Sequence, residues 1–259
     1  MLKRLKPRFF EKVWGSEHLG PWFASRGEKT GEIWFDSPAS MPLLVKFIFT
    51  SEKLSVQVHP DDQYAALHHN CCGKTEMWYI LAAQPGARIA AGFREPLSRK
   101  RMREAAHSGE ITDLLEWHPA APGDTFFIPA RTVHAIGEGL VLCEIQQASD
   151  ITYRIYDYGR PRELHLDHAV AVSKRGRHNA RPRPRGKRLV SCDYFTTERH
   201  VIQGRAQLDA PRLLVILEGQ GRIERRPARA VEVWHAAPQD SPVNIEGDLT
   251  LLAVSAPER

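Results

Sequence analysis

The sequence predicts an all-β protein: a double-sheet jelly roll with a small helical insertion, followed by a smaller second β domain. Three observations lead to this prediction. Short apolar or alternating stretches such as GEIWFD (31–36) and PLLVKFIFT (42–50) are separated by Pro and Ser, as in successive strands. Residues 96–117 carry a helical pattern. Strand-like stretches then resume and return once more after a basic segment.

The remaining elements follow from the same signals. Two short helices are expected within HPDDQYAALHHN (59–70), which offers an Asp N-cap, and within ELHLDHAVAVS (163–173). Further strands are expected at KLSVQVH (53–59), TEMWYILAA (75–83), ARIAAGF (87–93), DTFFIPA (124–130), GLVLCEIQQ (139–147) and TYRIYDY (152–158). Four more strands are expected in the tail, between residues 193 and 256.

A concentrated run of basic residues divides the chain. Eight Lys and Arg and no acid lie between Ser173 and Leu189, and without them the net charge of +5 becomes negative. Alternating Arg-Pro at 181–185 continues neither a helix nor a central strand, which favours an exposed, extended linker. We therefore expect a catalytic domain at 1–173, a basic linker at 174–189 and a small β domain at 190–259. The alternative for the linker is a weak contact with a polyanion, although it lacks aromatic residues for base stacking.

The composition favours a globular, reduced protein. The hydrophobic fraction is 42% and the charged fraction 26%, as in globular domains. No apolar stretch has the length of a membrane span, and MLKRLKPRFFEKVWG has no signal-peptide core. The four cysteines fit neither a disulfide framework nor a CxxC metal site, so a cytoplasmic location is expected. Adjacent Cys71 and Cys72 are weak metal candidates, because neighbouring strand residues face opposite ways.

Three short segments carry the chemistry: SVQVHP (55–60), GKTEMW (73–78) and PARTVH (129–134). Gln57 and His59 lie two apart in an extended run and should point to the same face. Glu76 directly precedes an apolar strand, where a buried carboxylate needs a cation. With His134 these residues form a mixed N/O ligand set that suits a divalent transition metal, zinc first. The alternative is an ordinary polar strand edge.

The motifs also resemble those of a known family. GDxxxxPAxxxH (123–134) is similar to the second cupin motif, and QxHPD with a following GKTE is similar to the first, with Gln in place of the usual leading His. With VWG (13–15), EIQQASDITYRIYDYGR (144–160) and RELHLDHA (162–169), the set resembles type I mannose-6-phosphate isomerases, in their short bacterial form.

This resemblance implies a cupin jelly roll and a function. The expected activity is the interconversion of D-mannose 6-phosphate and D-fructose 6-phosphate. One Zn²⁺ per chain, held by Gln57, His59, Glu76 and His134, polarises the carbonyl and stabilises an enediolate. Other divalent transition metals share such ligands. The second β domain is reduced relative to the family.

The resemblance also implies roles for residues near the ligands. Arg154 matches the catalytic arginine and suits an oxyanion or phosphate rather than proton abstraction. Ser55 and Lys74, each two residues from a ligand, match substrate-binding positions. Glu144 matches a family glutamate and is the hypothesised general base, against the alternative of a buried structural carboxylate.

Other functions remain open at this stage. The same chemistry on another sugar or sugar phosphate is one alternative, and phosphate dependence of turnover separates the two. A non-catalytic sugar-sensing cupin is another, although the whole residue set is retained. A polyanion binder built on residues 174–188 is a third. We expect a small phosphosugar partner, no membrane or nucleic-acid partner, and a monomer or weak homodimer.

Overall fold

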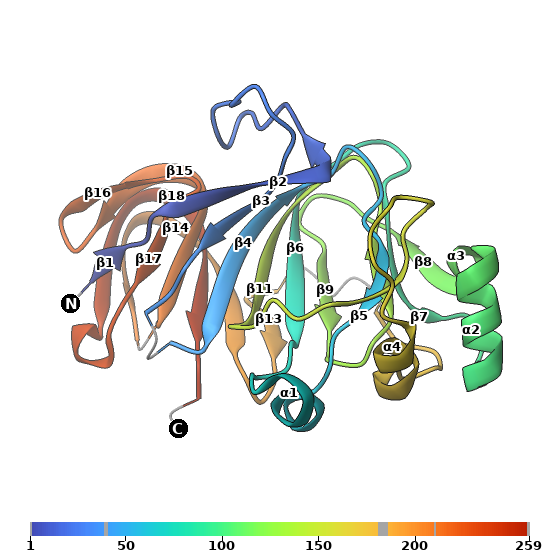
Figure 1. Ribbon diagram of the computed structural model, residues 1–259. Helices are drawn as coiled ribbons and strands as arrows, with labels where there is room; N and C mark the ends of the chain where they lie inside the picture. The colour runs from blue at the N-terminus through green and yellow to red at the C-terminus, as the bar shows by residue number, and fades with distance from the viewer. Residues whose placement is uncertain (1, 39–40, 181–185, 210, 258–259) are drawn as a thin grey trace.

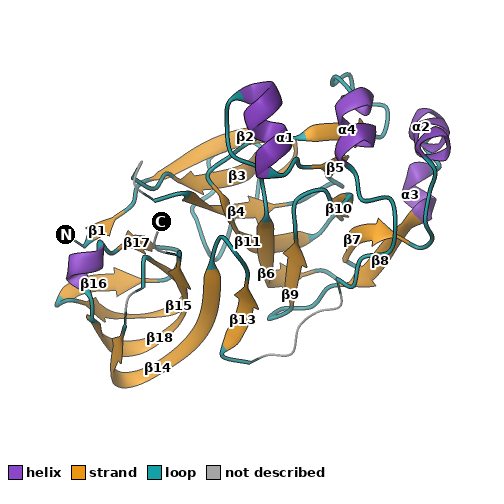
Figure 2. Ribbon diagram, turned by 90° about the horizontal axis from the view of Figure 1, so that it is seen from below, coloured by secondary structure: helices purple, strands orange, loops and turns teal. Residues whose placement is uncertain are grey.

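The computed structural model describes residues 2–38, 41–180, 186–209 and 211–257. Three sheets form successive layers from left to right in Figure 1, and three of the helices lie beside the sheet at the right (Figures 1 and 2). The predicted all-β class is confirmed. The RPRPR stretch at 181–185 lies outside the described residues.

The central layer is a six-stranded antiparallel sheet with the order β2-β3-β4-β11-β6-β9. Its strands are β2 (Pro7–Ser16), β3 (Thr30–Phe35), β4 (Leu43–Phe49), β11 (Leu140–Gln147), β6 (Glu76–Ala83) and β9 (Thr125–Ile128). All seven residues of β4 are buried, because both faces of this sheet are covered. This double burial explains the nearly continuous apolar run that β4 shows in the sequence.

A five-stranded sheet faces the central layer and completes the jelly roll. Its order is β12 (Tyr153–Tyr156), β5 (Val56–Val58), β10 (His134–Ile136), β7 (Arg88–Phe93) and β8 (Leu115–Pro119). Apolar side chains from both sheets share one core, in which Trp78 and Leu142 of the central layer meet Ile89 and Ile136 of the second. Burial of such side chains is the main driving force for closing the two sheets.

Helices cover the outer face of the five-stranded sheet. These helices are α2 (Arg99–Ser108), α3 (Ile111–Leu114) and α4 (Leu166–Val172), whereas α1 (Asp62–His69) lies below the sheets in Figure 1. Met102, Ala105 and Val170 pack there on the outward-facing side chains of β5 and β12. As expected, α1 has an Asp N-cap, since the Asp61 side chain accepts a hydrogen bond from the Tyr64 backbone amide.

The predicted helical stretch 96–117 contains α2 and α3, but its last three residues begin β8. Pairing with β7 along the sheet edge gives these residues an extended conformation that the local pattern does not reveal.

The third sheet contains the C-terminal strands and has the order β1-β17-β15-β18-β14-β13, with β16 paired to β15. Its strands are β1 (Lys3–Arg4), β13 (Arg188–Ser191), β14 (Thr196–Leu208), β15 (Leu213–Ile223), β16 (Arg226–Arg229), β17 (Val233–His235) and β18 (Val243–Ser255); the 3₁₀ turn η1 spans Pro238–Asp240. One face packs on the central layer, where Leu213 and Val254 meet Val45 and Phe47. The first strand of the chain therefore belongs to the sheet formed by its last strands.

The first part of the predicted linker is tied to the jelly roll. Backbone amides of Phe93 and Leu97 donate to the carbonyls of Gly176 and Arg175, and Lys174 forms a bridge with Thr132. Residues 174–180 thus run along the jelly roll instead of extending freely from it, and residue 188 already begins β13. None of the helices in the described part of the chain is long and apolar enough to span a bilayer.

Candidate metal centre and cavity

The predicted ligands come from both jelly-roll sheets. Glu76 begins β6 in the central layer, whereas Gln57 lies in β5 and His134 begins β10 in the facing sheet. Gln57 and His134 are direct neighbours in the register between β5 and β10. His59 directly follows β5 and lies two residues after Gln57 in the chain.

A close backbone approach places Glu76 next to His59. The Lys74 amide donates to the Pro60 carbonyl at 3.0 Å, which ties the segment before β6 to the segment after β5. A Cβ atom on Gly73 would lie 2.5 Å from the Asp61 backbone. Glycine at position 73 is therefore required for this contact.

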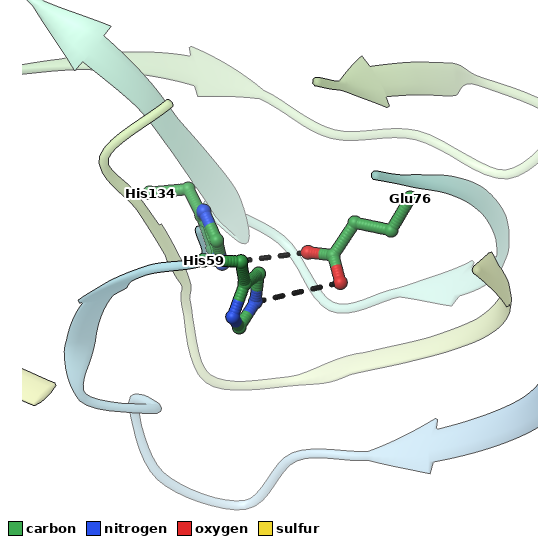
Figure 3. A group of neighbouring side chains, drawn as sticks. All are labelled: His59, Glu76 and His134. Atoms are coloured by element: carbon green, nitrogen blue, oxygen red, sulfur yellow. Dashed lines mark ion pairs between the residues drawn. The ribbon is translucent and has the colours of Figure 1, made fainter. Parts of the chain in front are cut away.

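The side chains of His59, Glu76 and His134 point toward one another (Figure 3). Glu76 Oε2 lies 3.5 Å from His59 Nε2, and Glu76 Oε1 lies 3.4 Å from His134 Nε2. Among the described residues, this is the only group of three potential ligands whose atoms lie within 4.8 Å of one another. Neither Cys71 nor Cys72 belongs to it.

Backbone carbonyls orient both imidazoles. His59 Nδ1 lies 2.8 Å from the Ile151 carbonyl, and His134 Nδ1 lies 2.9 Å from the Thr132 carbonyl. A carbonyl only accepts, so each Nδ1 carries the proton and each Nε2 presents a lone pair toward Glu76. Such outer contacts are typical of metal-ligating histidines.

The Glu76 carboxylate is fully buried, and within the described part of the chain its oxygens have ion-pair contacts but no hydrogen bond of standard geometry. Lys74 Nζ lies 3.0 Å from Glu76 Oε2 and 3.1 Å from His59 Nε2. Although burial alone raises the pKa of Glu76, Lys74 and the two imidazoles hold this pKa well below its usual value. Burial, with Lys74 second, lowers the pKa of His59 to about 3. An ionised carboxylate and two neutral imidazoles are the protonation states that a bound cation needs, so the residues fit one.

Gln57 completes the set and connects it to a cavity. Its Nε2 lies 3.3 Å from His134 Nε2, and Ser55 Oγ donates to its Oε1 at 3.2 Å. A glutamine binds a cation through its amide oxygen, so rotation of the amide would bring Oε1 to the side of His134. Gln57 also lines a polar cavity of about 310 Å³.

The cavity brings together the other predicted site residues: Ser55, Lys74, Glu144 and Arg154 all line it. Ser55 and Lys74 come just before β5 and β6. A larger cleft of about 760 Å³, around Trp117 and Tyr158, contains none of the predicted site residues.

Glu144 lies in the middle of β11 and is 3% exposed. Its Oε2 accepts a hydrogen bond from Trp78 Nε1 at 2.8 Å, and its Oε1 lies 3.4 Å from Lys46 Nζ. Burial, and after it the charge of Glu76, raises the pKa of Glu144. A raised pKa makes the carboxylate a stronger base than one in water, which suits proton abstraction.

Arg154 in β12 lies directly opposite Gln57 in the register with β5. Its Nη1 donates to the Glu163 carbonyl at 2.7 Å, while its buried Nε has no hydrogen-bond partner. Burial, and next the charge of Arg162, lowers the pKa of Arg154. An anion bound in the cavity would stabilise the charged guanidinium and so offset the effects of burial and of Arg162 on this pKa.

Comparison with known proteins identifies the family. Mannose-6-phosphate isomerase of Streptococcus mutans is 41% identical over an alignment of 209 positions that covers 74% of this chain and 66% of that protein, slightly under two thirds of its length. Mannose-6-phosphate isomerase ManA of Bacillus subtilis is 33% identical over an alignment of 271 positions that covers 84% of this chain and 86% of that protein. No family model matches the chain. The chain belongs to the mannose-6-phosphate isomerase family.

Solved structures agree with this membership. The crystal structure of the Bacillus subtilis mannose 6-phosphate isomerase has a TM-score of 0.84 and 28% identity, covering 97% of this chain and 98% of that one. A zinc-bound mannose 6-phosphate isomerase has a TM-score of 0.78 at 16% identity, covering 99% of this chain and 100% of the other, which shows a common fold. The predicted jelly roll and the resemblance are confirmed. As a member of this family, the chain is an enzyme of the isomerase class.

The sequence interpretation missed several residues that line the same cavity. Lys46 is 4% exposed, and it is the one charged residue in the apolar run of β4. That position was a signal, because a lysine within a strand buried on both faces needs an anionic partner. Arg162 also lines the cavity and is held by the buried Asp157, at 2.6 Å from Nε to Oδ2. The local sequence gives no sign of this second contact.

Proposed function

We propose that the chain interconverts D-mannose 6-phosphate and D-fructose 6-phosphate, with zinc held by Gln57, His59, Glu76 and His134. The observation that carries this proposal is the buried Glu76 carboxylate between two oriented imidazoles, beside a cavity that Glu144 lines. The mannose-6-phosphate isomerase relatives and the zinc-bound structure of the same fold support it.

The donor set favours catalysis over a purely structural metal site. One carboxylate, two neutral imidazoles and an amide would leave a divalent ion with a net positive charge. Zinc bound by these residues would supply a Lewis acid for the carbonyl oxygen of the sugar. Four thiolates would instead cancel that charge.

Glu144 is the proposed proton carrier. Isomerisation removes a proton from C2 of the open-chain aldose and adds one at C1, while the O2 proton passes to O1. A buried carboxylate with a raised pKa can accept the proton at C2 and return it at C1. Lys46 stabilises the ionised form of Glu144 before the transfer.

Arg154, Ser55 and Lys74 are the proposed substrate-binding residues. Arginine remains protonated and offers a fixed set of donors, which suits a phosphate or a developing oxyanion. The unpartnered Nε of Arg154 supports this role. Ser55 Oγ and Lys74 Nζ add donors beside the ligands, and a phosphate dianion needs several such donors.

We also propose the division into a catalytic unit at 1–173 and a small β domain at 190–259, since all proposed ligands lie in the first part. A hexose phosphate is charged and does not cross a membrane, which favours a cytoplasmic location. We propose a monomer or weak homodimer with a small phosphosugar as its partner.

Turnover of two sugars tests the function. Zinc-loaded protein should convert mannose 6-phosphate to fructose 6-phosphate and should turn over unphosphorylated mannose with a much lower kcat/KM, because binding of the phosphate stabilises the transition state. Equal turnover of the two sugars would favour the rival reading, an isomerase for free sugars. Tight binding of mannose 6-phosphate without any product would instead favour a sugar sensor and contradict the proposal.

A further inference from the structure

Four side chains form a row across the cavity side of the central layer: Trp34 in β3, Lys46 in β4, Glu144 in β11 and Trp78 in β6. Each is the direct register partner of the next. The four strands lie side by side in the sheet (Figure 1). Directly opposed side chains in neighbouring strands are close enough to contact each other. A buried ion pair is thus flanked by two indoles.

Few groups in the described part of the chain hold the Lys46 ammonium in place. Among the described residues, its one ion-pair partner is Glu144, with 3.4 Å between Nζ and Oε1. Against the effect of burial, the Lys46 charge also lowers the pKa of the neighbouring Glu32. The indole of Trp34 is a second contact, with its ring centroid 4.4 Å from Lys46 Nζ. The negative face of an indole attracts a cation, most strongly where water is excluded. Lys46 is 4% exposed, so this condition is met.

The Trp34 ring is itself held in place. Its Nε1 donates to Glu32 Oε2 at 2.8 Å, and Glu32 Oε2 lies 3.4 Å from Lys12 Nζ. The Phe10 ring packs on Trp34 with 4.6 Å between centroids. An indole fixed by a hydrogen bond and by a neighbouring ring presents a stable surface to Lys46.

The other end of the row reaches the metal centre. Trp78 Nε1 donates to Glu144 Oε2 at 2.8 Å, whereas Glu144 Oε1 has the ion pair with Lys46 and no hydrogen bond among the described residues. The Trp78 ring contacts the ring of His134 edge-on, with 5.4 Å between centroids. The row therefore defines the position of Glu144 relative to the proposed metal ligands.

We propose that Trp34 is a positioning residue that holds the Lys46 ammonium against Glu144 Oε1 and so keeps Glu144 in place for proton transfer. This inference rests on the proposed function, in which Glu144 carries the proton. Trp34 acts through Lys46, so its loss should slow proton transfer more than it weakens substrate binding.

Two substitutions and a control test the role of Trp34. Trp34→Leu removes the aromatic face, whereas Trp34→Phe retains a weaker one. Trp117→Leu is the matched control: Trp117 is another partly buried tryptophan, in β8, whose Nε1 donates to the Thr112 carbonyl. The control lies outside the row and should leave kcat and KM unchanged.

We expect Trp34→Leu to lower kcat about tenfold while KM changes less than about twofold, and Trp34→Phe to restore most of kcat. The acid limb of the kcat/KM profile should move to higher pH in Trp34→Leu, since the ammonium then stabilises the Glu144 carboxylate less. Unchanged kcat in Trp34→Leu, or equal losses in Trp34→Leu and Trp34→Phe, would contradict the inference. An inactive wild-type protein would overturn the proposed function instead.

An NMR measurement that needs no turnover distinguishes failure of the Trp34 inference from failure of the proposed function. The side-chain NMR signals of Lys46 should be shifted upfield by the ring current of Trp34. The shift should vanish in Trp34→Leu, remain in part in Trp34→Phe and be unaffected in Trp117→Leu. Lys46 signals that do not respond to Trp34→Leu would show that the indole does not hold the ammonium, whatever the activity of the wild type.

Discussion

At the residue scale, Glu144 has an environment that surface carboxylates lack. It is almost fully buried, one oxygen accepts from the Trp78 indole, and the other faces the Lys46 ammonium. These contacts fix the side chain, while burial favours its protonated form more than in water. A fixed carboxylate that gains and loses a proton easily is what isomerisation requires.

Glu144→Gln tests this role directly. Glutamine keeps the size of the side chain and can still accept from Trp78, but it cannot take up a proton. We expect kcat to fall about 10²- to 10⁴-fold, with KM and zinc content close to those of the wild type. Steady-state kinetics and metal analysis check this, with the exposed Glu138→Gln as a control. A variant that keeps more than about a tenth of kcat would exclude Glu144 as the base.

The pH profile should respond to Lys46. Lys46 and Lys74 lower the pKa of Glu144 and so oppose the larger effects of burial and of Glu76. Lys46→Met keeps the aliphatic bulk but removes one opposing charge, so the pKa of Glu144 should rise further. The ionised base then forms only at higher pH, and the acid limb of kcat/KM should move to higher pH. An acid limb that stays in place or moves to lower pH would contradict this assignment.

The sequence alone predicts the four proposed metal ligands but few of the residues that surround them. Gln57 and His59 are found because strand periodicity places them together, and Glu76 and His134 because of their motifs. Lys46 and Trp34 contact the same cavity through strand pairing, and pairing partners are not recorded in local sequence. The positions of Arg154 and Glu144 were expected only from the family resemblance.

At the element scale, β4 connects the layers. Phe47 faces the core shared with the third sheet, and Ile48 faces the core inside the jelly roll. Substitution in this strand therefore affects two interfaces that stabilise the molecule.

Phe47→Ala should lower the free energy of unfolding by about 3–5 kcal/mol, because Phe47 is fully buried and its removal leaves a cavity. Val201→Ala is the matched control, since Val201 is 57% exposed. Urea titration followed by circular dichroism measures both. A cost below about 1 kcal/mol for Phe47→Ala would mean that the interface with the third sheet is not packed in solution.

Elements with complete local signals were expected correctly. The Asp cap of α1 and the existence of α4 follow from their sequences. Residues 174–180 were expected as part of an exposed linker, and their hydrogen bonds to the jelly roll depend on tertiary contacts that composition does not encode.

At the scale of the whole molecule, the two ends of the chain meet in one sheet. Lys3 and Arg4 pair with His235 and Trp234, more than two hundred residues away. No local pattern predicts such a pair. The jelly roll itself was predictable, because short alternating or continuously apolar stretches recur along the chain, the continuous ones where a strand such as β4 is buried on both faces.

The central claim is that a bound metal, held by the four ligands, makes the whole protein an isomerase. Conversion of mannose 6-phosphate to fructose 6-phosphate should be measured on the purified protein, after chelation, and after zinc is restored, with zinc content determined each time. We predict that activity is lost with the metal and returns with one zinc per chain. Full activity in metal-free protein, or no activity in the zinc-loaded protein, would contradict the claim.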